Sequence, residues 1–288
     1  MREGDTDMRH MIITVVLVVL VALDETAAAQ DIDMETYSDP ETYVASGQER
    51  DPTVDVTRSP WSVEEVALAV CAYSHQRDDG TGRCDDYCAP DRSGCDICPY
   101  LPDRQDHVMS DEECAAFASE VVYRSLVLAG WPGEDDDYLE DVAFWIEAGI
   151  TVAIHESSIQ VYAMGHAAEC GSFQQQTQYA QPEDMRLAMG CTNAGRRNGC
   201  DLDDRVRICR WLQARPENQV FAFYANVGRD AGADWLCRYH DRSACDDAGS
   251  NGSRYESSVL GAIGTTRRAL RRAREIIEEN LDGEGDGG

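Results

Sequence analysis

A single carboxyl group, that of Glu156, stands where the sequence could place a general acid. At about 100° per residue, six upstream residues lie within about a quarter turn of the same helical face: Val142, Trp145, Ile146, Gly149, Val152 and Ala153. The helical pattern stops at Ser157-Ser158, so Glu156 would lie at the C-terminal end of an apolar face. Partial burial raises the pKa of a carboxylic acid toward neutral pH, where a general acid must hold its proton. Most helix glutamates are simply solvated, so the pattern needs support from other residues.

That support comes from the residues that follow Glu156. Ser157 comes directly after it, and Gly171-Ser172-Phe173-Gln174 ends eighteen positions after the glutamate. A helix that ends in Glu-Ser, then a variable turn and Gly-x-x-Gln, resembles the soluble lytic transglycosylases of the lysozyme-like superfamily. Their motif is Glu-Ser followed by Gly-Leu-Met-Gln at the same separation.

The third motif of that family, Tyr-Asn-Ala-Gly, is matched in part between positions 224 and 228. Asn226 and Gly228 agree with it, whereas Ala225 stands where the family has its tyrosine. Tyr224 is the nearest residue that could replace that tyrosine, although neighbouring residues of a helix point about 100° apart. The resemblance covers roughly residues 139–262.

The resemblance implies a role for each matching residue. Glu156 would protonate the glycosidic oxygen between N-acetylmuramic acid and N-acetylglucosamine in peptidoglycan. Gln174 would line the sugar site, and Gly171 would let the backbone come close to the glycan. The full set implied around the sugar is Ser157, Gly171, Gln174, Tyr224, Asn226, Gly228 and Tyr255.

The number of carboxyl groups bears on the type of reaction. Retaining and inverting glycosidases need two carboxyl groups beside the scissile bond, but the first acid downstream of Glu156 is Glu169. With one acid, the 6-hydroxyl of the muramic acid is the nearest nucleophile, and its attack gives a 1,6-anhydro product, as the resemblance also implies. We therefore expect a lyase. Glu169 becomes the residue of interest if the products are hydrolysed instead.

The residues around Glu156 suggest two alternatives to this role. His155-Glu156 begins like the zinc motif His-Glu-x-x-His, but Ile159 occupies the position of the second ligand, so we expect no metal and no cofactor. His155 itself lies about 100° round the helix from Glu156. The second alternative is a structural glutamate in an exported, disulfide-rich, non-catalytic domain that binds the cell wall or a protein.

The N-terminus and the cysteines indicate export. Residues 11–23 form a short apolar run and Ala27-Ala28-Ala29 offers a cleavage site, so residues 1–29 are expected to be a signal peptide of a secreted or periplasmic protein. All twelve cysteines lie between Cys71 and Cys245, an even number that favours disulfides in an oxidising compartment. Two pairs are close enough in sequence to form locally, Cys191 with Cys200 and Cys237 with Cys245. A zinc site remains the alternative for Cys84, Cys88, Cys95 and Cys98.

The charge is strongly negative and limits the possible partners. The net charge is −29, or about −26 without residues 1–29, and all 25 basic residues are arginine. Nucleic acid is therefore excluded as a partner. We expect peptidoglycan glycan strands as the partner, a monomer, and no membrane span once the signal peptide is removed.

The predicted fold is mainly α, a lysozyme-like α+β fold with at most a small β-hairpin, stapled by disulfides. Residues 30–60 are expected to be an acidic disordered linker, 61–135 a cysteine-rich helical region, 136–282 the lysozyme-like domain and 283–288 a flexible tail. Capping boxes at Ser62 and Ser110 predict helices to about residue 75 and to Gly130. Further helices are expected over 139–157, 183–189, 203–214, 217–224, 231–239 and 265–281, with a hairpin between Tyr162 and Phe173.

The last of these helices carries the one cluster of positive charge, formed by Arg267, Arg268, Arg271, Arg272 and Arg274. This face could dock on the acidic body, bind cell-wall carboxylates, or simply be solvated.

Overall fold

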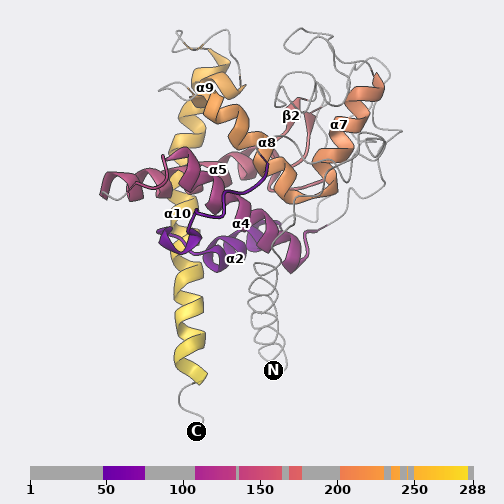
Figure 1. The fold of residues 1–288 in the computed structure, drawn as a ribbon. Coiled ribbons are helices and arrows are strands. Elements are labelled where there is room, and N and C mark those ends of the chain that lie inside the picture. The colour runs from indigo at the N-terminus through magenta and orange to yellow at the C-terminus, as the bar shows by residue number, and fades with distance from the viewer. Residues whose placement is uncertain are drawn as a thin grey trace.

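The computed structural model describes residues 48–74, 108–133, 136–163, 169–176, 202–229, 235–240, 245 and 250–284. The described chain is mainly helical, as the sequence predicted. The elements, in chain order, are η2 (Val56–Arg58), α2 (Val63–Ser74), α4 (Asp111–Leu128), α5 (Asp136–Ser157), β1 (Glu169–Cys170), β2 (Gln175–Gln176), α7 (Leu202–Ala214), α8 (Pro216–Arg229), α9 (Trp235–His240) and α10 (Asn251–Glu284) (Figure 1). The helix predicted over 183–189 lies outside the described residues.

Local side-chain chemistry fixes where α2 and α4 begin. The Glu65 N–H donates to Ser62 Oγ (3.2 Å) and the Ser62 N–H donates to the Glu65 carboxylate (2.8 Å). Ser110 and Glu113 form the same reciprocal pair at the start of α4. α4 ends just before Gly130, whose positive φ of 99° suits a residue without a Cβ. Both predicted capping boxes are therefore confirmed.

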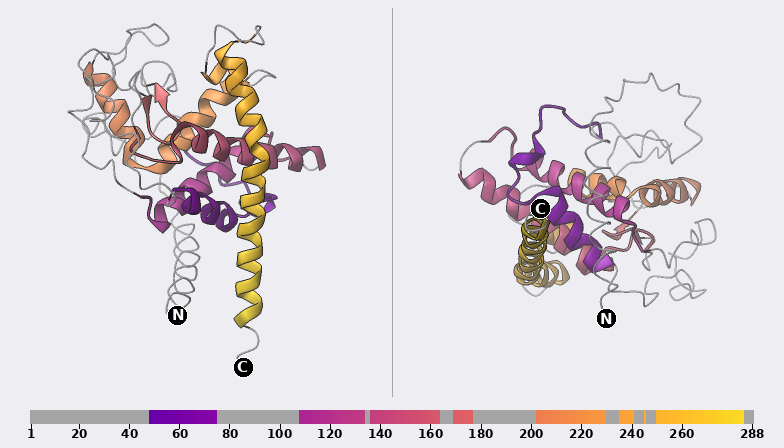
Figure 2. Two further views of the ribbon diagram at one scale, coloured as in Figure 1. Left: turned by 180° about the vertical axis from the view of Figure 1, so that it is seen from behind. Right: turned by 90° about the horizontal axis from the view of Figure 1, so that it is seen from below.

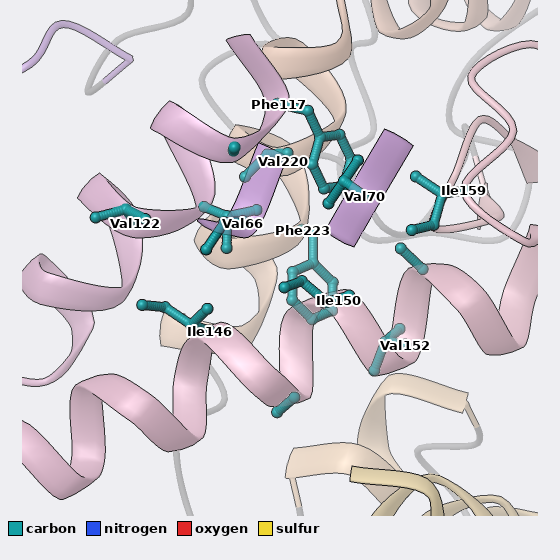
Figure 3. Close-up of a cluster of buried hydrophobic side chains, with 14 of the residues drawn as sticks. Val66, Val70, Phe117, Val122, Ile146, Ile150, Val152, Ile159, Val220 and Phe223 are labelled. Atoms are coloured by element: carbon teal, nitrogen blue, oxygen red, sulfur yellow. The ribbon is translucent and has the colours of Figure 1, made fainter. Parts of the chain in front are cut away.

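The core lies where α2, α4, α5 and α8 pack together (Figure 3). Phe117 of α4, Ile146 and Ile150 of α5, and Phe223 of α8 are 3% exposed or less and face one another there. One hydrophobic cluster runs from Trp61 to Ala273. The regions predicted as 61–135 and 136–282 therefore contribute to the same core.

Residues 48–60 differ from the predicted disordered linker. Arg50 pairs with Glu120 of α4 (2.8 Å), and the Asp51 N–H donates to the Tyr123 hydroxyl (2.6 Å). Gln48 donates to Asn218 of α8 (2.7 Å). These partners lie 70 or more positions away along the chain, so the acidic, proline-containing composition gave no sign of them. Residues 30–47 lie outside the described part.

Helix α10 is much longer than the predicted 265–281. It begins after Ser250, whose hydroxyl accepts the Ser253 N–H (3.1 Å). Two views show it running across α5 and extending past the other described elements at its C-terminal end (Figure 2). Its buried side chains are Tyr255, Val259, Ile263, Thr266, Leu270 and Ala273.

The five clustered arginines of α10, within residues 267–274, divide into two groups. Arg267 binds both carboxylate oxygens of Glu147 on α5, and Arg274 binds Glu65 and lies over the Trp61 ring. Docking on the acidic body is therefore correct for these two residues. The others, Arg268, Arg271 and Arg272, are exposed.

Three disulfides join the described elements. Cys71–Cys114 links α2 to α4, Cys170–Cys209 links β1 to α7, and Cys237–Cys245 is the local pair that the sequence suggested. The remaining six cysteines, including Cys191 and Cys200, lie outside the described residues. None of the described helices has the length and apolar character needed to cross a bilayer.

Candidate active site

Glu156 lies in the last turn of α5 and is half-buried. Burial raises the pKa of its carboxyl group from 4.5 to about 7, and the negative charge of Glu169 acts in the same direction. The nearby Tyr255 hydroxyl acts in the opposite direction, but its effect is smaller than that of burial. A carboxyl group with this pKa keeps its proton near neutral pH, as a general acid requires.

Tyr255 reaches Glu156 from α10. Its side chain is 7% exposed, and its hydroxyl makes no hydrogen bond of ordinary length and angle within the described part of the chain. The two groups nevertheless interact, since each shifts the pKa of the other. Burial and the charge of Glu156 together raise the pKa of Tyr255 well above its usual value.

Two imidazole rings pack on Tyr255. The His155 ring meets it edge to face at a centroid distance of 5.2 Å, and the His240 ring stacks on it at 4.6 Å. Both histidines are exposed to solvent. His155 therefore lies beside the tyrosine and outside the buried face of α5, in agreement with its predicted direction.

Ser157 joins the end of α5 to the Gly-x-x-Gln turn. Its hydroxyl donates to the Ser172 carbonyl (2.9 Å) and accepts the Gln160 N–H (3.0 Å). The two motifs that are separated in sequence are thus adjacent in space. Gln174, at the end of the turn, is half-buried and donates from Nε2 to the Gly171 carbonyl (3.0 Å).

The Gly-x-x-Gln turn is the turn of a small hairpin. β1 and β2 are antiparallel, with Glu169 opposite Gln176 and Cys170 opposite Gln175. The sequence predicted a hairpin ending at Phe173, so its second strand was placed too early. Phe173 belongs to the turn, and its ring is fully buried against Phe223, with centroids 4.4 Å apart.

Gly171 has a different neighbour from the one expected. Its φ is +77°, and a Cβ at this position would lie 2.5 Å from Oε1 of Gln219. The space beside Gly171 is therefore filled by a buried side chain of α8. The glycine is needed for this packing and for the positive φ, and the approach of a glycan to its backbone stays a prediction.

Tyr224 does not stand in for the missing tyrosine. Its hydroxyl donates to the Trp145 carbonyl (2.8 Å) and hydrogen-bonds Ser125 (3.0 Å), and it fills the space beside Gly149. Gly149 precedes Glu156 by seven residues, or about two helical turns. Tyr224 is therefore a core residue whose polar group is satisfied away from the acid.

The other two residues of the third motif also lie on α8. Gly228 is exposed and lies against Leu128 of α4, so close that a Cβ added to this glycine would lie 3.4 Å from the leucine side chain. Asn226 is 5% exposed. The α8 residue that contacts the Gly-x-x-Gln turn is Gln219.

Sequence reasoning missed two residues that contact this turn. Gln219, which is 1% exposed, accepts the Ser172 N–H (2.6 Å). The Tyr239 hydroxyl donates to the Phe173 carbonyl. The only signal for Gln219 was a polar residue at the start of the apolar stretch of α8, and Tyr239 had none.

The zinc interpretation gains no support from the described residues. Ile159, at the position of the second ligand, is fully buried, and no group of three or more metal-binding side chains gathers in the part of the chain that the structure describes. Comparisons with protein-family models, with curated proteins and with solved structures gave no match to the chain.

Proposed function

We propose that this protein is a lytic transglycosylase that cleaves the β-1,4 bond between N-acetylmuramic acid and N-acetylglucosamine in peptidoglycan. The observation that carries the proposal is the environment of Glu156. Its pKa of about 7 would keep it protonated near neutral pH, and the Ser157–Ser172 hydrogen bond (2.9 Å) holds the Gly-x-x-Gln turn next to the end of its helix. An acid and an amide side chain would then lie on neighbouring segments, as a bound glycan requires.

The chemistry would proceed in two stages. Glu156 donates its proton to the glycosidic oxygen as the bond from C1 to that oxygen breaks, and the substrate's own N-acetyl group compensates the positive charge that develops on the sugar. The Glu156 carboxylate then takes the proton of the 6-hydroxyl, whose oxygen forms a bond to C1. The products are a 1,6-anhydro-muramic end and a free 4-hydroxyl on N-acetylglucosamine. Tyr255 would stabilise the carboxylate between the two stages.

The disulfides and the net charge bear on the cellular location. Three disulfides join described elements, and disulfides persist mainly in oxidising compartments. We infer that the protein is exported and meets the cell wall there. The net charge of −29 repels anionic wall polymers at long range, which favours action close to the cell that makes the protein.

Hydrolysis is the second candidate reaction, because the charge of Glu169 is felt at Glu156. A second carboxylate near the acid could activate a water molecule. Glu169 is half-buried on β1, directly before the disulfide-bonded Cys170. Transglycosylation is preferred since it needs only Glu156.

Incubation of the mature protein with purified peptidoglycan tests the proposal. Soluble products should be one water lighter than hydrolysed muropeptides and should take up no hydride from borohydride. Glu156→Gln should lower the rate by on the order of 10² to 10⁴, the contribution of a positioned general acid. Glu140→Gln, an exposed glutamate of the same helix, is the control and should have no effect.

Three outcomes would change the assignment. Products that are all reducible would mean hydrolysis, and Glu169→Gln would then be the next variant. A Glu156→Gln protein as active as the parent would remove the acid from its proposed role. If no form cleaves the glycan, sedimentation with intact sacculi decides whether the protein is a binding domain.

A further inference from the structure

The Gly-x-x-Gln turn is held on both sides at Ser172. The Ser172 carbonyl accepts from Ser157 of α5 (2.9 Å), and the Ser172 N–H donates to Gln219 of α8 (2.6 Å). Ser157 is the immediate neighbour of Glu156. The distance between the turn and the acid is therefore set jointly by α5 and α8.

The Gln219 amide is fixed by the bonds that it makes in this position. Its Nε2 donates to the Val161 carbonyl and to the Leu212 carbonyl, both at 2.9 Å, while Oε1 accepts from Ser172. Its backbone carbonyl accepts from the Gln175 side chain (2.9 Å). With 1% exposure, the amide has no bulk water to replace a lost partner, so its orientation is determined.

Tyr239 holds the other end of the turn. Its hydroxyl donates to the Phe173 carbonyl, the residue directly before Gln174. Burial and the charge of Glu156 both raise the pKa of Tyr239, so the hydroxyl stays protonated and can donate this bond. The short helix α9, which carries Tyr239, is tied by the Cys237–Cys245 disulfide.

We propose that Gln219 and Tyr239 are positioning residues that set where Gln174 lies relative to Glu156, and so determine how tightly a glycan binds beside the acid. Neither residue is assigned a contact with substrate. Gln219 acts through the Ser172 N–H, and Tyr239 acts through the Phe173 carbonyl. The inference rests on the proposed function for its catalytic consequence, but its structural part can be measured without activity.

Two substitutions test it, each with a matched control. Gln219→Ala removes the amide, and Asn218→Ala removes the neighbouring amide of α8, which is 2% exposed and donates to the Trp211 carbonyl (2.8 Å). Tyr239→Phe removes one hydroxyl, and Tyr138→Phe removes another that also donates to a carbonyl, that of Leu126 (3.3 Å). Within the described contacts, only the first member of each pair bonds to the turn.

The first readout is hydrogen exchange at the backbone amides of Ser172 and Gln174, measured on the full mature chain. Exchange should accelerate at Ser172 in Gln219→Ala and at Gln174 in Tyr239→Phe, relative to the parent and to each control. The second readout is the rate of cleavage of soluble glycan strands as a function of concentration. A turn misplaced by about 1 Å costs on the order of 10²-fold in efficiency, and we expect most of it as a higher KM.

The controls separate positioning from general destabilisation. A merely destabilised protein has fewer folded molecules, which lowers the apparent kcat and leaves KM unchanged, and this is the result expected of Asn218→Ala and Tyr138→Phe. If Gln219→Ala does not fold, Tyr239→Phe carries the test alone. The proposal is overturned if exchange at Ser172 and Gln174 matches the controls, or if KM rises equally in the controls. An inactive parent would refute the proposed function, while the exchange measurement still decides the positioning.

Discussion

The raised pKa of Glu156 predicts that removing its charge stabilises the protein in a pH-dependent way. The folded state holds this proton more tightly than the unfolded state does, because burial raises the pKa from 4.5 to about 7. Between these two values the folded state binds more protons, so the free energy of unfolding falls as pH rises. Below pH 4.5 Glu156 is protonated in both states, and its full stabilising effect is present. Above about pH 7 Glu156 is charged in both states, and this stabilising effect is lost completely.

The magnitude follows from the same numbers. A rise from 4.5 to about 7 corresponds, at about 1.4 kcal/mol per pKa unit, to about 3 kcal/mol. Because the side chain is only half-buried and water screens part of its charge, about 2 kcal/mol is the expected effect. Glu156→Gln cannot ionise, so it should be more stable than the parent by about this amount at pH 8 and equal to it near pH 4.5.

Urea unfolding of the parent and of Glu156→Gln from about pH 4.5 to about pH 8.5 measures this difference. Glu140→Gln, which is exposed on the same helix, should show no such trend and controls for the change in net charge. A stability difference between Glu156→Gln and the parent that stays constant across this range would refute the reasoning, since it would mean that Glu156 ionises equally in both states. The test needs no substrate, so it examines the acid independently of the proposed reaction.

Three further predictions follow from other contacts. Tyr255→Phe removes a hydroxyl that lowers the pKa of Glu156. The alkaline limb of the kcat–pH profile should therefore move to higher pH, by up to about one pKa unit. A shift to lower pH would contradict the interaction between Tyr255 and Glu156. Arg267→Ala leaves the carboxylate of Glu147, which is 1% exposed, without its arginine. Because the Arg267 side chain is itself 47% exposed, the loss should lower the free energy of unfolding in urea by only about 2 kcal/mol. Arg272→Ala is the control and should cause no measurable change, since the partners of Arg272 are all exposed. Replacing both cysteines of Cys170–Cys209, or both of Cys71–Cys114, with serine should lower the free energy of unfolding by a similar amount, about 4 kcal/mol, because the sequence separations are 39 and 43. Only Cys170–Cys209 borders the Gly-x-x-Gln turn, so only its loss should weaken glycan binding beyond the loss of folded protein.

The helices were predictable where local chemistry determines them. The Ser62 and Ser110 boxes involve residues three positions apart, and the apolar face of α5 is a pattern within one helix. The approach of the Glu156 helix to Ser172 was suggested by the resemblance of the two motifs. Tyr255 was expected at the sugar site from the same resemblance, and its hydroxyl interacts with the Glu156 carboxyl group.

The errors have a common physical origin in contacts that are distant along the chain. Residues 48–60 looked disordered by composition, yet Arg50 meets Glu120 at 70 positions. Tyr224 was predicted to replace the tyrosine that is missing at Ala225, but its hydroxyl hydrogen-bonds Ser125, which is 99 positions away. Gln219 could not be found because the Ser172 N–H that it accepts is 47 positions away and carries no side-chain pattern.

The candidate site also depends on whether the long helix α10 has packed on α5. Its Arg274 bonds to Glu65 across 209 positions, and its Tyr255 lies beside Glu156. Both contacts join residues that are distant in sequence, so closing these loops costs more entropy than forming contacts within one helix. Until α10 has packed on α5, Glu156 has neither its tyrosine nor the burial that α10 supplies, and it ionises more nearly as an ordinary surface carboxylate. A chain in which α10 has not packed on α5 therefore lacks part of the environment that raises the pKa of Glu156, and we expect it to cleave no glycan by the proposed mechanism.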